Sequence, residues 1–348
     1  MLKEMHLIPT IGLVIGDPTG IGPELVARLL QDEDALRDAR VVVIGNPELL
    51  ELGLKTIGVR KEVPVFDADS VGNAPIAVLQ GPRFDLSILT PGKVQVEAGQ
   101  FSLDCFGEAF KLFEQGLIEA IVYAPINKEA VVKTGCAEFH DPLTGDTDEL
   151  QLFVNKLHWR HKLFGELNVV DDLWTGRVTS HIPLSAIVSY LTVEGILNAI
   201  RLMDTTLKTA GVDRPIVAVS ALNPHGGEHG LVGREEIDII EPAIREAQRE
   251  CIDARGPFPA DTVFVRVRRD GYHAVVSMYH DQGQIAMKLL GFPRGVTVPG
   301  GLPMPFATPS HGTAHDIAGK GVADVGAMRA AFVLGKRMAQ TRLRNTQQ

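Results

Sequence analysis

Short apolar runs alternate with segments of helical periodicity along this chain. Strands are expected at short segments, most of them apolar, namely residues 11–15, 41–45, 120–124, 168–170, 177–180, 216–221 and 274–278. Helices are expected where apolar residues recur with helical spacing, at 25–30, 47–52, 101–115, 193–210, 235–250 and 325–341. This alternation predicts an α/β protein with a largely parallel sheet.

Composition places the chain among globular proteins of two domains. It has 348 residues, of which 45% are hydrophobic and 22% charged. The net charge of -9 and the lack of a Lys/Arg run give no support to a nucleic-acid partner. The cysteines Cys105, Cys136 and Cys251 match no zinc or CxxC spacing, which fits a reducing compartment. Without a signal-like N-terminus or an apolar run of membrane length, we expect a cytoplasmic protein with no membrane partner.

Three histidines follow predicted strands directly. They are His181, His225 in Asn-Pro-His-Gly-Gly-Glu, and His280 in Tyr-His-Asp-Gln-Gly. Ligands of α/β sheets gather at the carboxyl ends of strands, and three imidazoles with an open position suit a catalytic metal. Any one of them alone is better explained as a histidine that makes a structural hydrogen bond. Three placed alike favour a divalent metal site.

Two glycine-rich segments are further candidates. Residues 16–24 form a strand-to-helix turn with Pro23 at a first helical position, and the alternative is a loop that lines a ligand cleft. Residues 310–321 precede the last helix and contain Asp316. A carboxylate there would accept hydrogen bonds from ribose hydroxyls and repel a 2′-phosphate, so it favours NAD over NADP. The alternative for Asp316 is a turn or N-cap carboxylate.

Lys288 and Asp261 are candidate proton-handling groups. Lys288 lies on the helix expected after His280, and Asp261 is expected to open a strand. A lysine beside a metal site could steer a proton, and a carboxylate could act as a base or orient a ligand. Taken alone, each is better explained as a solvated surface charge.

Five motifs occur in the order found in the 4-hydroxythreonine-4-phosphate dehydrogenase family of pyridoxal phosphate synthesis, which the chain therefore resembles. They lie at residues 16–24, 124–128, 223–228, 279–283 and 311–314, and the resemblance runs from about residue 11 to 329. Residues 310–321 also resemble the adenosine loop of isopropylmalate dehydrogenase.

The resemblance implies a two-domain α/β/α fold like that of isocitrate and isopropylmalate dehydrogenases. Residues 1–140 and 295–348 would form a nucleotide-side domain, and 141–294 a domain for metal, substrate and dimerisation. It also implies a homodimer with the active site at the interface, and NAD(P)-linked oxidation of a secondary alcohol followed by loss of a carboxylate.

The resemblance assigns roles to individual residues. The metal, zinc or else Mg²⁺, Mn²⁺ or Co²⁺, would be held by His181, His225 and His280, with one histidine donated across the dimer. Lys288 and Thr147 match substrate-contacting residues of the family. The cofactor residues would be His311, Gly312, Thr313, Ala314 and Asp316.

Three positions depart from the family pattern. Asp146 stands where the family has a histidine, Thr297 where it has an asparagine, and Phe306 where it has an arginine. Exchanging cations for a carboxylate and a ring disfavours a phosphate dianion. We therefore predict a carboxylate substrate resembling the terephthalate cis-dihydrodiol of one family branch, oxidised to a catechol acid and CO2. The alternatives are 4-phosphohydroxy-L-threonine, a phosphothreonate or phosphoerythronate, and an inactive sensor that binds metal and nucleotide.

Overall fold

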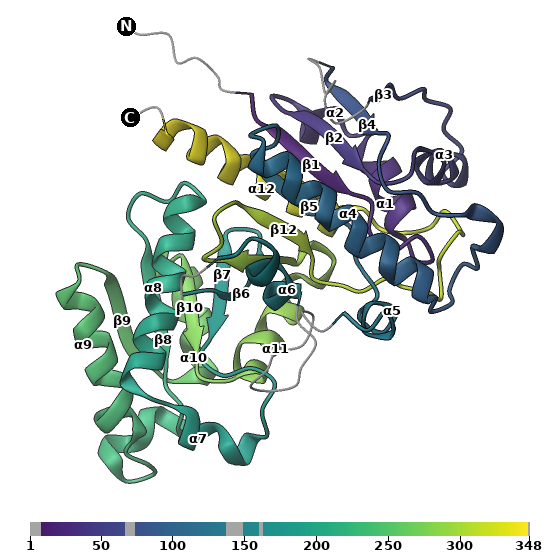
Figure 1. Ribbon diagram of the computed structural model, residues 1–348. Helices are drawn as coiled ribbons and strands as arrows, with labels where there is room; N and C mark the ends of the chain where they lie inside the picture. Colours follow the sequence, from purple (N-terminus) through teal and green to yellow (C-terminus); the bar gives the residue numbers. More distant parts are fainter. Residues whose placement is uncertain (1–7, 67–73, 137–148, 160–162, 347–348) are drawn as a thin grey trace, which may run out of the picture. The chain divides into compact units, whose positions relative to one another are not determined.

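The computed structural model describes residues 8–66, 74–136, 149–159 and 163–346 (Figure 1). Contacts divide the chain into two compact units, Met1–Trp159 with Pro303–Gln348, and Arg160–Leu302. We call them the first and second unit and describe each by itself. The predicted roles of nucleotide-side domain and metal domain stay predictions.

The first unit contains a six-stranded sheet in the order β3-β4-β2-β1-β5-β12. Each strand pair in this part of the sheet is parallel. The strands are β1 (Thr10–Val14), β2 (Arg40–Ile44), β3 (Val65–Phe66), β4 (Ile76–Leu79), β5 (Ala120–Tyr123) and β12 (Phe306–Pro309). The strands β1, β2, β4 and β5 are short buried apolar runs, which belong in the middle of a parallel sheet, where both faces are covered.

Helices cover both faces of the first unit's sheet. They are α1 (Gly22–Leu29), α2 (Glu33–Leu36), α3 (Pro47–Thr56), α4 (Val96–Glu114), α5 (Lys128–Lys133), α6 (Glu149–Lys156) and α12 (Gly326–Thr346). Successive residues of a strand point to opposite faces. On β5, Val122 lies against Gly335 of α12, whereas the ring of Tyr123 packs edge-on against Phe106 of α4, 5.2 Å between centroids. The unit is therefore a three-layer α/β/α structure.

The second unit contains strands in the order β11-β6-β7-β10-β8-β9. They are β6 (Gly165–Val170), β7 (Leu173–Arg177), β8 (Ile216–Ser220), β9 (Asp253–Phe258), β10 (Ala274–Ser277) and β11 (Val296–Gly300). The pairs β7–β10, β10–β8 and β8–β9 are parallel, and β11–β6 and β6–β7 are antiparallel. The carboxyl ends of β7, β8 and β10 therefore lie at one edge.

The second unit's helices also lie on both faces of its sheet. They are α7 (Ile187–Tyr190), α8 (Val193–Thr209), a π-helix (Glu236–Ile240), α9 (Glu241–Arg249), α10 (Ala260–Asp270) and α11 (His280–Gly291). Met203 of α8 contacts Gly176 on one face of β7. On the other face, Gly283 of α11 fits against Thr175 and Ser277, where an added Cβ would lie about 3 Å from either hydroxyl.

The predicted α/β fold with a largely parallel sheet is confirmed, and two local predictions are wrong. The strand expected at 177–180 is β7, which ends at Arg177. Asp261 does not open a strand but lies in the first turn of α10, because Val263 and Val267 recur one turn apart and bury one face of a helix. Within the described residues, no single helix is long and apolar enough to cross a membrane; only the bent pair Leu184–Tyr190 and Val193–Thr209 reaches that length and composition together.

Candidate active site

His181 and His280 lie side by side at the ends of β7 and β10. The amide of Thr179 donates to the carbonyl of Met278 at 3.2 Å, and its hydroxyl donates to the same carbonyl at 2.8 Å. These bonds continue the parallel pairing past the last strand residues, so the two loops leave the sheet together. The ring centroids of His181 and His280 are 5.7 Å apart, with the ring planes at 44°.

This histidine pair fits two ligands of one metal ion. With ordinary metal–nitrogen distances, two imidazoles of a tetrahedral shell have ring centres roughly 5 Å apart. The Nδ1 atom of His280 lies 2.7 Å from a carboxylate oxygen of Asp281. Metal-binding histidines commonly donate one ring nitrogen to a carboxylate, which leaves the other free for the metal.

His225 does not complete the set within one chain. Among the described residues, no three His, Cys, Asp or Glu side chains are close enough together to hold a metal. The predicted metal set of His181, His225 and His280, with one histidine donated across the dimer, stays a prediction. Within this chain, His225 opens a run of five residues, His225 to His229, that all have positive φ.

His225 itself is exposed and carries carboxylate neighbours. Its Nδ1 atom lies 2.7 Å from Glu228, and this hydrogen bond raises the pKa of the His225 ring. The charge of Asp261 acts in the same direction. Asp261 is itself exposed. Its effect on the His225 ring shows that its carboxylate lies near the His225 loop.

A buried carboxylate that the sequence interpretation missed fixes the start of this loop. Glu236 is 2% exposed and accepts hydrogen bonds from the amides of Leu222 and Asn223, at 2.9 and 2.7 Å. Its other oxygen accepts from the side chain of Asn223 at 2.9 Å. Nothing in the sequence distinguishes Glu236 from its neighbour Glu235, so no signal could have found it.

Lys288 lies on α11 in line with His280. Residues four apart share one side of a helix, so His280, Gln284 and Lys288 form one row. Lys288 is exposed, and Gln284 hydrogen-bonds to the Oδ1 atom of Asn168 on β6. The Nδ2 atom of Asn168 donates to the hydroxyl of Thr297 at 3.1 Å. Gln284, one turn before Lys288, therefore joins a polar network that includes Thr297.

The centre of that network is Arg177, which the sequence interpretation also missed. Its side chain is 8% exposed, and its three nitrogens donate to Ser180, Asn168 and Glu166 at 2.8, 2.9 and 3.0 Å. A buried guanidinium needs partners of this kind. Its only sequence signal is an arginine at the end of a strand.

Phe306 is a core residue, and its predicted role in substrate binding is wrong. It is 0% exposed on β12, and its ring stacks on Phe153 with centroids 4.8 Å apart and planes at 13°. Two other predicted substrate residues, Asp146 and Thr147, lie outside the described residues.

The predicted nucleotide loop, residues 310–321, lies in the first unit. Thr313 is buried, Ala314 has a φ of 43°, and the ring of His311 contacts the carbonyl of Gly312 at 3.0 Å. Asp316 is exposed and, within the described part of the chain, accepts no hydrogen bond. This finding does not support the N-cap alternative, and it leaves the carboxylate available to a ribose.

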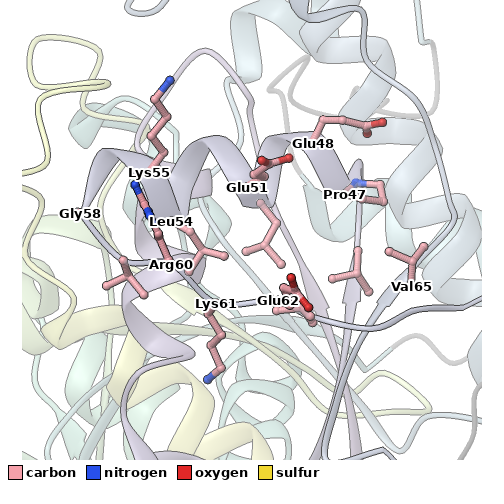
Figure 2. A pocket seen from close by; sticks show the side chains of 14 residues that line it. Pro47, Glu48, Glu51, Leu54, Lys55, Gly58, Arg60, Lys61, Glu62 and Val65 are labelled. Atoms are coloured by element: carbon pink, nitrogen blue, oxygen red, sulfur yellow. The ribbon is translucent and has the colours of Figure 1, made fainter.

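A separate hollow of about 1160 Å³ lies in the first unit over α3 and β3 (Figure 2). None of the described candidate residues lines it. Its charged side chains are three of each sign, Glu48, Glu51, Glu62, Lys55, Arg60 and Lys61. Figure 2 shows them spread around the rim, with Lys55 and Lys61 pointing apart. No ligand charge is selected by this arrangement.

The fold and the histidine pair define an α/β protein with a candidate metal site at the strand ends of its second unit. The chain belongs to the PdxA family: the family model for the pyridoxal phosphate biosynthetic protein PdxA matches residues 37–335. The family resemblance drawn from the five motifs is thereby confirmed.

Individual relatives cover nearly the whole chain. A protein of Rhizobium meliloti, provisionally named 4-hydroxythreonine-4-phosphate dehydrogenase 2, is 44% identical over 95% of this chain and 94% of its own length. The D-threonate 4-phosphate dehydrogenase of Salmonella typhimurium is 37% identical over 95% and 99%. The crystal structure of 4-hydroxythreonine-4-phosphate dehydrogenase from Klebsiella pneumoniae superposes with a TM-score of 0.83, at 33% identity, covering 96% of this chain and 99% of that one.

These comparisons overturn the prediction of an aromatic cis-dihydrodiol substrate. The terephthalate 1,2-cis-dihydrodiol dehydrogenase of Burkholderia xenovorans is only 24% identical, with a TM-score of 0.65, which shows the shared fold alone. The relatives named for phosphorylated substrates are much more similar. The error has a physical origin, because Phe306 was taken for a ring in the site and lies in the core instead.

Proposed function

We propose that this chain is a metal-dependent, NAD-linked dehydrogenase that oxidises the secondary alcohol of 4-hydroxythreonine 4-phosphate, with loss of the carboxylate as CO2. The observation that carries this proposal is the His181–His280 pair at adjacent strand ends, in a chain of the PdxA family. The names of its relatives support the phosphorylated substrate.

The roles of the chain's own residues follow from their positions. When bound, a divalent metal such as zinc would polarise the alcohol oxygen and stabilise negative charge that develops during loss of CO2. His181 and His280 would hold it, with Asp281 orienting the His280 ring. Lys288, on the same row of α11 as His280, would carry the proton to or from the reacting carbon atoms. The NAD would bind over residues 311–316, with Asp316 on the adenosine ribose.

The site is compatible with a phosphate. With Phe306 in the core, its ring no longer argues against a dianion. Lys288 is exposed on α11, and an ammonium group is a suitable donor to a phosphate oxygen; Thr297 belongs to the hydrogen-bonded network that Gln284 of the same helix joins. We propose that these two side chains face the substrate.

D-Threonate 4-phosphate is a second candidate substrate. The observation that favours it is the 37% identity to the Salmonella typhimurium enzyme named for that compound. Both candidates carry a phosphate and a carboxylate, and they differ in having an amino or a hydroxyl group beside the carboxylate. The same metal and lysine would therefore serve either.

We further propose that a second copy of this chain supplies His225. The second unit exposes large apolar side chains on the segments that carry the three histidines, namely Leu184, Val188, Leu231, Ile285 and Leu289, which are 50–83% exposed. Exposed apolar groups gathered near a functional site are typical of an interaction surface. In a two-fold dimer, His225 of each chain would reach the His181–His280 pair of the other.

The substrate is tested by steady-state kinetics. NADH formation is measured with 4-hydroxythreonine 4-phosphate, D-threonate 4-phosphate and the unphosphorylated acids, before and after removal of metal by a chelator. We expect turnover of one phosphorylated compound, its loss with the chelator and its recovery with Zn²⁺. Equal turnover of an unphosphorylated acid would refute the phosphate assignment, and full activity in metal-free protein would refute the metal.

The shared site is tested by mixing subunits. Neither His181→Ala nor His225→Ala alone should be active. In a mixed dimer, the site with the intact His181–His280 pair would receive the intact His225 of the other chain, so remixing should restore about a quarter of the activity if subunits exchange at random. Remixed chains that exchange yet stay inactive would show that His225 is not donated by the partner. Remixing His181→Ala with His280→Ala is the matched control, because these two variants damage the same pair and should restore nothing.

A further inference from the structure

The glycine-rich segment at residues 16–24 contacts the predicted nucleotide loop at several points. The amide of Ile21 donates to the carbonyl of Thr313 at 3.0 Å. Gly20 lies so close to Thr313 that an added Cβ would be 2.7 Å from the Thr313 carbonyl oxygen. The hydroxyl of Thr19 lies 3.3 Å from the Nε2 atom of His315. Residues almost 300 positions apart in the chain are therefore fitted together.

Asp17 is the first buried carboxylate of this segment. It is 1% exposed, and its Oδ1 atom accepts from the amide and from the hydroxyl of Thr19, both at 2.7 Å. Its Oδ2 atom is buried and makes no hydrogen bond within the described part of the chain. That oxygen lies 3.6 Å from Nε2 of His315, a residue of the nucleotide loop. Burial raises the pKa of Asp17, while Thr19 and His315 oppose this effect.

Glu24 is the second buried carboxylate, and it holds the end of the same loop. It is 3% exposed and accepts from the amides of Ala323 and Gly321, at 2.8 and 3.2 Å. Arg28, one helical turn on, donates to Glu24 at 3.0 Å and to the Gly321 carbonyl at 2.6 Å. Gly321 is thus hydrogen-bonded on both sides, through its amide to Glu24 and through its carbonyl to Arg28.

We propose that Asp17 and Glu24 are positioning residues for the nucleotide loop, which they hold in the conformation that binds NAD. Asp17 acts on its middle through His315, and Glu24 acts on its end through Gly321 and Ala323. Asp316 lies between these two points, with its carboxylate free. This inference rests on the proposed NAD-linked function, and it gives the glycine-rich segment a supporting role, not a phosphate-binding one.

The test compares Asp17→Asn and Glu24→Gln with Glu33→Gln, an exposed carboxylate of the same unit. Each replacement keeps the size of the side chain and removes its charge. Hydrogen exchange is measured over residues 310–324, together with the Kd for NAD, the KM for each substrate and kcat. The full-length, metal-loaded protein is used throughout.

We expect the two buried variants to exchange faster over residues 310–324 and to bind NAD about tenfold more weakly, because hydrogen bonds to a charged acceptor are lost. The KM for the phosphorylated substrate and kcat at saturating NAD should stay unchanged, and Glu33→Gln should match the wild type. If Glu24→Gln does not fold, Arg28→Ala removes the contact with the Gly321 carbonyl and carries the same expectation.

Two outcomes separate this proposal from the proposed function. Wild-type protein that binds no NAD would refute the function, whatever the variants do. If the wild type binds NAD, and the variants keep the same Kd for NAD but unfold at a lower temperature, the positioning role alone is overturned. Unchanged exchange over residues 310–324 would also overturn it.

Discussion

Replacing Phe306 by alanine tests where this side chain acts. In the structure its ring is fully buried between Phe153, stacked at 4.8 Å, and Phe110, whose centroid is 6.3 Å away. If Phe306 packs the core, the variant loses stability and leaves substrate binding alone. If it lined a substrate site, the variant would keep its stability and bind substrate more weakly.

The expected loss of stability is large. Truncating a buried phenylalanine to alanine costs about 3–5 kcal/mol of stability, because the free energy of burying the ring is lost and a cavity remains in its place. Aromatic pairs add about 0.5–1.5 kcal/mol beyond the buried area. With no exposed ring surface and two aromatic neighbours, Phe306 belongs near the upper end, at roughly 4–5 kcal/mol. That is a large share of the usual 5–15 kcal/mol of a folded protein.

Urea unfolding followed by circular dichroism measures this loss. The control is Phe113→Ala, which truncates a half-buried ring of α4 that lies 4.7 Å from the Arg342 guanidinium. Since less area is buried there, we expect roughly half the loss. A loss below about 1 kcal/mol at Phe306, with a raised KM for the substrate, would refute the core assignment.

Three other predictions concern the cofactor, pH and thiols. Asp316→Ala should narrow the preference for NAD over NADP, since the carboxylate no longer repels a 2′-phosphate, and kinetics in which the wild type prefers NADP would contradict this. Burial raises the pKa of Glu119 above its ordinary 4.5, so its contribution to stability is complete below that value and is lost as pH rises through the folded pKa. Glu119→Gln should therefore gain stability relative to the wild type above pH 4.5, and melting curves with a constant difference across pH would contradict it. Burial raises the pKa of the Cys105 thiol well above its usual range, so iodoacetamide should label the exposed Cys251 first, and mass spectrometry of the native protein would detect a reversed order.

The fold could be predicted from the sequence because periodicity reports burial directly. The runs at 11–15, 216–221 and 274–278 became β1, β8 and β10 with ends displaced by one residue. Asp261 was misassigned because a short alternation of apolar and polar residues in 260–267 fits both a strand and one face of a helix. The segment is helical because Val263 and Val267, one turn apart, both pack against Ala218 and Val275.

The candidate site could be predicted only in part, because strand ends fix where a loop begins and not where it goes. His181 and His280 were brought together since Thr179 extends the pairing of their two strands. His225 is the first of five left-handed residues, a conformation that glycine permits but that no periodicity reports. Buried polar partners such as Arg177 are equally hidden, because their role depends on neighbours that are distant in sequence.

Substitutions at family positions acquire meaning only once the surroundings of the side chain are known. Phe306 and Thr297 both depart from the family pattern, and each departure argues against a phosphate only if the side chain faces the substrate. Phe306 proved to lie in the core. The hydroxyl of Thr297 instead accepts a hydrogen bond from the side-chain amide of Asn168, and the Oδ1 atom of the same asparagine accepts one from Arg177. The hydroxyl at position 297 is thus linked through Asn168 to a buried arginine. A threonine held in this hydrogen-bonded network keeps the position polar, so this departure alters the shape of the site without excluding the substrate that the family implies.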